Sequence, residues 1–369
     1  MPFCIDLRSG LLHTGNVPGP HYFLLIIRIP NETLMVTFSP QRQSNTASGY
    51  TVISPKTTSL LREVAAAREH HSWIQSLTFS ADGAIMASGS NDRTIRLWDV
   101  RDLARGPETI AVLEGHQGCI WSVDFSPDGA LLASSANDNT VKLWEVASNP
   151  YEFVTFADHN EAVYAVTFSR NGRFLASASH DAMVRIRDVA QIRTTGRTPQ
   201  CTVLEHISHV YAITFSPCTR WLVSASRDSL LRIWDLHPEN IREIGRTKPR
   251  GLVGHRSWIN AVTFSPTGKW LASGSHDRTV RLWDMATFQE VAMFDGHSES
   301  VTAIAFSPDS KLLASASKDN TVRIWDVVNQ RQLTIIPERK AINTLSFTPD
   351  GTMLALGGGD GAIKFLGIV

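Results

Sequence analysis

A phrase that recurs seven times along these 369 residues limits the fold more than any other feature of the sequence. It consists of an aliphatic residue, a variable residue, phenylalanine and, in most copies, serine and proline. Consecutive phenylalanines are 41 to 49 residues apart. A period of this length is typical of β-propeller blades, each of which contains four strands. The seven residues are Phe79, Phe125, Phe168, Phe215, Phe264, Phe306 and Phe347.

Two turns and two further apolar runs follow each copy of the phrase. The first turn, such as Pro127-Asp128-Gly129, leads into small and apolar residues, as at 271–275. A second turn with an aspartate precedes a run such as 279–284. Short apolar and β-branched runs divided by Gly, Pro, Asn and Asp predict antiparallel strands. The aspartates are Asp92, Asp138, Asp181, Asp228, Asp277, Asp319 and Asp360.

Three other residue types recur at fixed distances from these markers. A histidine stands nine residues before six of the phenylalanines: His70, His116, His159, His206, His255 and His297. A serine stands four residues before six of the aspartates: Ser88, Ser134, Ser177, Ser224, Ser273 and Ser315. A tryptophan stands six residues after five of the aspartates: Trp98, Trp144, Trp234, Trp283 and Trp325.

Together these features resemble those of the WD-repeat family. Trp98-Asp99 and Trp283-Asp284 match the dipeptide that names the family, and Gly115-His116 and Gly254-His255 match its Gly-His signature. The resemblance covers roughly residues 60–369. It implies an all-β chain that forms a seven-bladed β-propeller of four-stranded antiparallel blades.

The resemblance also implies that the recurring side chains form a hydrogen-bonded set, from Trp to Ser, Ser to His and His to Asp. A blade buries both faces against its neighbours, so polar groups inside it need partners. Serine, histidine and aspartate also form catalytic triads, but a triad occurs once, whereas we expect this set intact in five repeats. No Gly-x-Ser-x-Gly nucleophile turn accompanies it. We therefore predict structural roles for these residues and no enzyme activity.

Two repeats depart from the pattern. The third has Arg187 at the tryptophan position, and we expect this arginine to pair with an acidic neighbour. The last repeat has Glu338, Leu356 and Leu366 at the histidine, serine and tryptophan positions and keeps only Asp360. We expect both blades to pack less rigidly than the others.

Ring closure is expected to join the two ends of the repeat region. The last inner strand, residues 362–367, ends almost at the terminus, and residues 60–67 have the right position to supply its missing outer strand. We predict a propeller over 59–369 and an N-terminal extension over 1–58, either poorly ordered or a degenerate half-blade. The phrase recurs at 36–40, which leaves an eight-bladed ring as the alternative.

Ligands of WD-repeat proteins usually bind the face formed by the loops after the outer strands and the turns before the aspartates. The resemblance implies that three residues per repeat project there: those three and five after the histidine, and the one before the aspartate. Many are Trp, Tyr or Arg, which interface hot spots favour. The candidate binding residues are Trp73, Trp121, Tyr164, His180, His209, Tyr211, Arg227, Trp258, His276 and Lys318.

We therefore expect a scaffold or adaptor that binds a protein or peptide without catalysis. The chain has 35 basic and 35 acidic residues, which argues against general nucleic-acid affinity. Basic residues at 190–203 and 241–250 leave an RNA-associated propeller as the alternative. The histidines at 180, 209 and 276 could also converge on a metal ion, although we expect no metal and no cofactor.

Composition and apolar runs also suggest where the protein works. The four cysteines show no metal-ligand or disulfide pattern, which favours a reducing compartment. The apolar run at 22–27 is too short to cross a bilayer. We expect a cytoplasmic protein, with the nucleus as the alternative, in which a monomeric ring belongs to a larger complex. The regular repeats also resemble propellers appended to NACHT-type signalling ATPases, in which the ring is a sensor.

Overall fold

The computed structural model of the chain describes residues 23–29, 32–38, 50–146, 149–195, 201–236 and 248–368. The chain divides into two compact units, Met1–Ala47 and Ser48–Val369. In the first unit, β1 (Phe23–Ile29) and β2 (Glu32–Phe38) form a two-stranded antiparallel sheet. The other residues before Tyr50 lie outside the described part, so the character of the extension over 1–58 stays a prediction.

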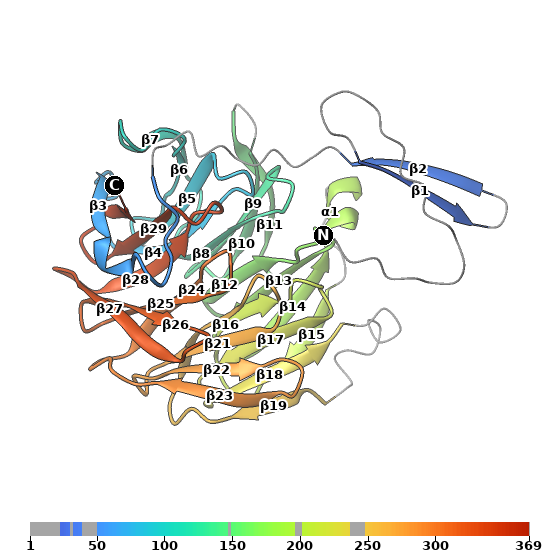
Figure 1. Cartoon of the computed structure of the whole chain (residues 1–369). Helices are drawn as coiled ribbons and strands as arrows, with labels where there is room; N and C mark the ends of the chain where they lie inside the picture. The colour runs from blue at the N-terminus through green and yellow to red at the C-terminus, as the bar shows by residue number, and fades with distance from the viewer. Residues whose placement is uncertain are drawn as a thin grey trace. The chain divides into compact units, whose positions relative to one another are not determined.

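The second unit contains seven four-stranded antiparallel sheets arranged around a common axis (Figure 1). This confirms the predicted seven-bladed propeller. The phrase at 36–40 begins within β2 of the separate two-stranded sheet and builds no eighth four-stranded blade. The alternative with eight blades is therefore wrong.

Each blade runs outward from a first strand near the axis. The first strands are β4 (Ile74–Phe79), β8 (Ile120–Phe125), β12 (Val163–Phe168), β16 (Val210–Phe215), β20 (Ile259–Phe264), β24 (Val301–Phe306) and β28 (Ile342–Phe347). The second strands are β5 (Ile85–Ser90), β9 (Leu131–Ala136), β13 (Phe174–Ser179), β17 (Trp221–Ser226), β21 (Trp270–Ser275), β25 (Leu312–Ser317) and β29 (Met353–Gly358).

The two outer positions of each blade complete the sheets. The third strands are β6 (Ile95–Asp99), β10 (Val141–Glu145), β14 (Met183–Asp188), β18 (Leu230–Asp235), β22 (Val280–Asp284), β26 (Thr321–Asp326) and β30 (Ile363–Gly367). The fourth strands are β7 (Glu108–Leu113), β11 (Tyr151–Phe156), β15 (Thr202–Glu205), β19 (Arg250–Val253), β23 (Gln289–Phe294), β27 (Arg331–Pro337) and β3 (Arg62–Ala67). The short helices are η1 (Thr58–Leu60) and α1 (Val189–Thr195), and no helix in the described residues is long and apolar enough to cross a membrane.

The ring closes through a strand from the other end of the chain, as predicted. In the last blade, β3 pairs antiparallel with β30, from Arg62 opposite Gly367 to Ala67 opposite Ile363. Upstream of β3, Ile53 is almost fully buried in the apolar core between the sixth and last blades. Closure removes the edges that an open stack of sheets would expose.

The recurring phrase builds the hairpin between the first two strands of each blade. In the second blade, Phe125 is buried, and the Ser126 hydroxyl accepts the Leu131 N–H at 2.9 Å. The Gly129 N–H donates to the Ser126 carbonyl at 2.8 Å, and Gly129 has a φ of 70°, which glycine adopts without strain. The hairpin therefore uses a hydroxyl acceptor and a left-handed residue at these positions. Thr348 supplies the hydroxyl in the last blade, and Thr219 and Ser310 adopt the positive φ in the fourth and sixth blades.

Small residues on the second strands allow neighbouring blades to pack closely. All six residues of β9, β13, β25 and β29 are buried. A Cβ at Gly274 in β21 would lie 2.6 Å from the Val301 side chain at the start of the next blade. The core is therefore divided among the interfaces between successive blades.

Candidate functional site

Four blades contain the complete hydrogen-bonded set. In the second blade, the Trp144 Nε1–H donates to Ser134 Oγ at 2.8 Å, and Ser134 Oγ lies 2.7 Å from His116 Nε2. His116 Nδ1 lies 2.9 Å from Asp138 Oδ2. Distances in the other three blades differ by no more than about 0.1 Å. Their residues are His70, Ser88, Asp92, Trp98; His255, Ser273, Asp277, Trp283; and His297, Ser315, Asp319, Trp325.

The aspartates of these sets are held as carboxylates. Burial alone would raise the pKa of Asp138, but hydrogen bonds from His116 and Thr140 outweigh it and hold the pKa far below its usual range. The same balance, with donors Thr321 and His297, holds the pKa of Asp319 at about 2. A carboxylate accepts the Nδ1–H of the histidine, so Nε2 accepts the serine hydroxyl proton and every polar group of the set has a partner.

These sets are unsuited to hydrolysis because their serines are inaccessible. All six serines of the repeats, including Ser177 in the third blade and Ser224 in the fourth, have no exposed surface. A catalytic serine must reach a substrate carbonyl. The sets therefore act as internal struts of the blades.

The third blade replaces the tryptophan with an ion pair. Arg187 has 1% of its surface exposed, and its Nη1–H donates to Ser177 Oγ at 3.0 Å. Its Nη2 lies 2.5 Å from Asp158, and its guanidinium carbon lies 4.5 Å from the centre of the Phe156 ring. His159 keeps its contacts with Ser177 and Asp181, at 2.9 and 2.8 Å. Arg187 thus takes over the tryptophan's hydrogen bond, and Asp158 is its acidic partner.

The prediction of five intact sets is wrong for the fourth blade. Trp234, Ser224 and His206 are connected as elsewhere. Arg232, however, lies 3.3 Å from His206 Nδ1 and donates to Asp228 at 2.7 Å, so it separates the histidine from the aspartate.

The fourth blade also lacks a hydroxyl two residues after the aspartate. Thr94, Thr140, Thr279 and Thr321 occupy this position in the four complete sets, and each donates to its aspartate at 2.6 to 2.7 Å. In the fourth blade this residue is Leu230. The carboxylate lacks that donor, and Arg232 supplies one instead. In the third blade, where the position holds Met183, Arg185 likewise reaches Asp181, at 3.2 Å.

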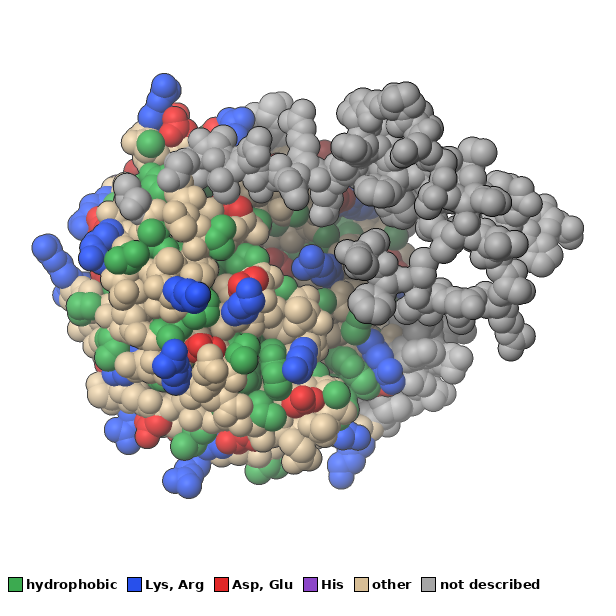
Figure 2. All heavy atoms as spheres, viewed as in Figure 1, with side chains coloured by type: hydrophobic (Ala, Val, Ile, Leu, Met, Phe, Trp, Pro, Cys, Tyr) green, Lys and Arg blue, Asp and Glu red, His purple; other side chains and the backbone are tan. Residues whose placement is uncertain are grey.

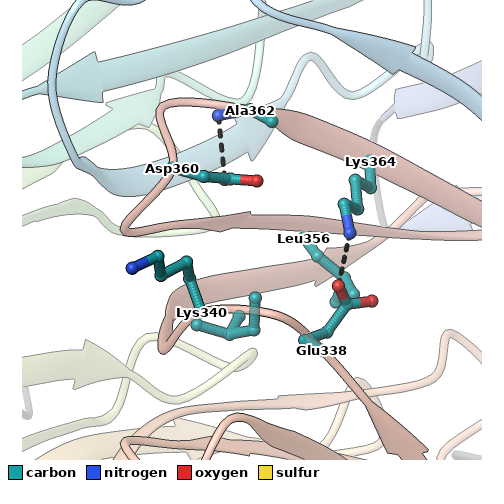
Figure 3. A pocket seen from close by; sticks show the side chains of 7 residues that line it. Glu338, Lys340, Leu356, Asp360, Ala362 and Lys364 are labelled. Carbon is teal, nitrogen blue, oxygen red and sulfur yellow. Dashed lines mark hydrogen bonds and ion pairs between the residues drawn. The ribbon is translucent and has the colours of Figure 1, made fainter.

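The last blade has an ion pair and a small hollow where the set would lie. Lys364 contacts Glu338, which occupies the histidine position, and the Asp360 carboxylate accepts the Ala362 N–H (Figure 3). The hollow is lined by Glu338, Lys340, Ile342, Leu356, Asp360, Ala362 and Lys364. Ala362, which is smaller than the threonine found at this position in the complete sets, is one of the residues that border this space.

The top face, formed by the loops that carry the repeat histidines and the turns before the aspartates, gathers an array of rings. Trp121, Tyr164, Tyr211 and Trp258 come from four successive blades, with centroid distances of 5.0, 5.1 and 6.2 Å between neighbours. We call these rings, together with His180, His209 and His276, the aromatic arc. Burial raises the pKa of Tyr164 and Tyr211, so both phenols keep their protons and can donate.

A repeated β-bulge sets the rings in this arrangement. Trp121, Tyr164 and Tyr211 are the second residues of β8, β12 and β16, and the pairing with the next strand skips that residue each time. A bulge redirects the side chain out of the regular pleat. Here it brings each ring against the ring of the next blade.

The remaining bulge positions have polar side chains that are used internally. The amide of Asn260 donates to the Val301 carbonyl at 2.9 Å, and that of Asn343 donates to the Ile74 carbonyl at 3.2 Å. The Thr302 hydroxyl donates to the Ile342 carbonyl. These side chains fasten one blade to the next, whereas the rings of the aromatic arc offer partly exposed faces. We did not predict this division from the sequence, although the residue types at the bulge positions indicate it.

The histidines of the aromatic arc stack on other rings. His180 and His209 are 3.4 Å apart with an angle of 19° between their planes. The His209 Nδ1–H donates to the His180 carbonyl at 2.6 Å. His276 stacks on Trp258 at 5.3 Å. The described residues contain no group of three or more side chains arranged to bind a metal ion, and His276 is engaged with Trp258 instead of the other two histidines.

Eight of the ten candidate residues form one contact series. Arg227 completes it, with its guanidinium carbon 4.5 Å from the centre of the Trp258 ring. Trp258 is 38% exposed, whereas Trp121 is half-buried. Trp73, 53% exposed, and Lys318 make no ring or ion-pair contact with this series in the described residues.

Fold and site define a seven-bladed propeller with internally braced blades and an aromatic surface on one face. Seven segments match the family described as WD domain, G-beta repeat: residues 62–99, 107–145, 152–188, 197–235, 246–284, 288–326 and 330–365. They cover more than half of the chain, which therefore belongs to the WD-repeat family. A comparison with curated proteins returns no significant match.

Proposed function

We propose that this chain is a non-catalytic scaffold that binds a protein or peptide through the aromatic arc on its top face. The observation that carries the proposal is the contact series from Trp121 to Trp258, which spans four blades. Rings held by one another lose little conformational freedom on binding, which favours affinity. Their histidine and phenol groups add hydrogen-bonding capacity beside apolar surface.

Burial and charge support this surface over the others. Exposed Trp258 lies among Tyr211, His276 and Arg227, so a partner can cover several rings at once. Among the large exposed apolar side chains elsewhere, Tyr151 and Met293 lie singly on outer strands, Ile110 and Val112 lie two residues apart on β7, and Ile207 lies in a loop. Contiguous apolar patches mark interaction sites more often than scattered residues do.

The RNA-associated alternative has less support. Arg193 in the first basic loop pairs with Asp128 at 2.7 Å, and Arg250 near the second stacks on Phe288. On the face shown in Figure 2, basic side chains are spread out and interspersed with acidic ones. A backbone-binding groove needs aligned basic charge. The rest of both loops, 196–200 and 241–247, lies outside the described residues.

The test is capture of partners from cell extract by the full chain, quantified by mass spectrometry. Trp121→Ala combined with Trp258→Ala should reduce recovery of specific partners at least about thirtyfold, since hot-spot truncations cost about 2 kcal/mol or more. Tyr151→Ala combined with Met293→Ala is the matched control, because it removes two exposed apolar side chains from outer strands. Undiminished recovery by a folded arc variant would refute the proposal.

A further inference from the structure

Three arginines at the top of the fourth and fifth blades have no acidic partner in the described residues. Arg227 and Arg278 flank the aspartates of their turns, and Arg256 follows the histidine of the fifth blade. Their guanidinium groups make no ion pair and no hydrogen bond in the described part of the chain. By contrast, Arg185 and Arg232, on the third strands of the third and fourth blades, are paired with aspartates at 3.2 and 2.7 Å.

Arg227 is held in position despite its exposure. Its guanidinium carbon lies 4.5 Å from the centre of the Trp258 ring, and its backbone N–H donates to the His209 carbonyl at 2.9 Å. An arginine stacked on an aromatic ring keeps its N–H edge free for a planar anion. Less entropy is then lost when a carboxylate binds both N–H groups.

No nearby carboxylate of the chain competes for this arginine. Asp228 is bound by Arg232, and Asp277 accepts hydrogen bonds from His255, Thr279 and the Arg256 N–H. The exposed Glu161 lies on the third blade, where it contacts His180 at 3.3 Å. The aromatic arc therefore has unpaired basic charge at blades 4 and 5, and the acidic side chain beside it lies at the third blade.

We infer that the aromatic arc binds a peptide segment in which an acidic side chain adjoins an apolar or aromatic one. The carboxylate pairs with Arg227, and the apolar side chain packs against Tyr164 and Tyr211. Charge complementarity selects this occupant, because a basic segment would meet three uncompensated arginines. The inference rests on the proposed function and specifies the partner's chemistry.

The test is selection of a random twelve-residue peptide library on the full chain, followed by affinity measurements on the enriched peptides. The wild type should enrich peptides with Asp or Glu beside Phe, Tyr, Trp or Leu. Arg227→Ala should weaken those peptides roughly tenfold or more, and Arg227→Glu should shift enrichment toward Lys and Arg. Replacing Asp or Glu of an enriched peptide by Asn or Gln should have the same effect as Arg227→Ala.

Arg220→Ala is the matched control. Arg220 is also an exposed arginine stacked on a tryptophan, 4.4 Å from the Trp221 ring centre, but it lies at the opposite end of β17 from Arg227. The control should leave both enrichment and affinity unchanged. A second set of peptides has a phosphorylated residue in place of Asp or Glu. If these phosphopeptides bind more tightly than the acidic peptides, phosphate and not carboxylate is the preferred anion.

The outcomes separate this inference from the proposed function. Enriched peptides that are neutral or basic, yet lose binding in Trp121→Ala with Trp258→Ala, would overturn the acidic preference and leave the proposed function standing. Peptides that bind equally well to that arc variant would overturn both. Equal weakening by Arg220→Ala and Arg227→Ala would also overturn the inference, because it would reveal a general charge effect.

Discussion

Replacing Arg187 tests whether the recurring side chains are struts. Arg187→Ala removes a hydrogen bond to buried Ser177, worth about 1 kcal/mol, and a buried cation–π contact with Phe156, worth about 1–2 kcal/mol. The ion pair with half-exposed Asp158 adds at most about 1 kcal/mol. We therefore expect the free energy of unfolding to fall by about 2–4 kcal/mol.

Restoring the repeat pattern should reverse this loss. Arg187→Trp returns an indole N–H to Ser177, and Asp158→Gly removes the carboxylate left without its partner. Well-packed apolar groups often match or exceed a buried ion pair in stability. The double variant should therefore be as stable as the wild type or up to about 2 kcal/mol more stable, whereas Asp158→Gly alone should be less stable than either.

Urea unfolding monitored by circular dichroism measures these differences, with hydrogen exchange of the third blade as a local readout. Arg220→Ala is again a suitable control, because it also removes an arginine stacked on a ring but at an exposed position. Wild-type stability in Arg187→Ala would refute the structural role. So would a double variant no more stable than Arg187→Ala.

Three further predictions concern buried polar groups. Burial and nearby Arg232 lower the pKa of His206 to about 3, so below about pH 6.5 the unfolded chain takes up a proton that the folded chain does not. The free energy of unfolding therefore falls as the pH falls, by about 2–3 kcal/mol at pH 4.5. Hydrogen exchange should show the fourth blade opening at pH 4.5, whereas equal protection at pH 7 and 4.5 would contradict this. Burial raises the pKa of Asp124 to about 6, against hydrogen bonds from the Phe168 N–H and Thr167. The unfolded carboxyl ionises near pH 4, so the fold loses stability as the pH rises from about 4 to 6 and the whole loss is present at pH 7. Asp124→Asn should therefore stabilise the fold by about 1–3 kcal/mol at pH 7 and hardly at pH 4 in thermal unfolding, and a loss of stability at pH 7 would be evidence against it. Ser134→Ala leaves the Trp144 N–H and His116 Nε2 without hydrogen-bond partners. Urea unfolding should therefore show that the free energy of unfolding falls by about 2–4 kcal/mol, while the folded variant captures partners normally. Weakened capture would show that this hydrogen-bonded set also contributes to binding.

Much of the fold follows from the sequence because each blade uses the same local chemistry. The Phe125-Ser126 hairpin recurs with a hydroxyl residue after the phenylalanine and a left-handed residue three positions further on, so the period of the phrase counts the blades. The strand pairing of residues 62–67 with 363–367 was also predictable, since the last blade lacked a strand. These features depend on neighbours along the chain or on the need to close a ring.

Features that depend on the relation between repeats were harder to predict. The lost contact between His206 and Asp228 accompanies Leu230, where complete sets have threonine. His159 keeps its aspartate although the third blade lacks this threonine too, so only the structure shows that Arg232 separates the pair in the fourth blade. Asp158 stands where three other repeats have glycine and two have glutamate, so this position alone does not identify it as the partner of Arg187. A closer comparison of the repeats could have drawn attention to both blades without giving these contacts.

The aromatic arc was only partly predictable. The residue types of Trp121, Tyr164 and Tyr211 marked them as candidates, and the order of the blades follows from the order of the repeats. Their mutual contacts require the bulge in each first strand, which no local sequence signal indicates. Trp73 carries the same signal as Trp258 but makes no ring contact with the arc in the described residues.

Site-specific photocrosslinking tests most directly whether partners bind at the aromatic arc. A photoreactive phenylalanine analogue replaces Tyr211 in the arc or, as the control, Tyr151 on an outer strand. Both variants should fold and recover the same partners before irradiation. We predict covalent capture from position 211 and little from position 151. Capture from position 151 alone, with partner recovery intact in both variants, would contradict the account.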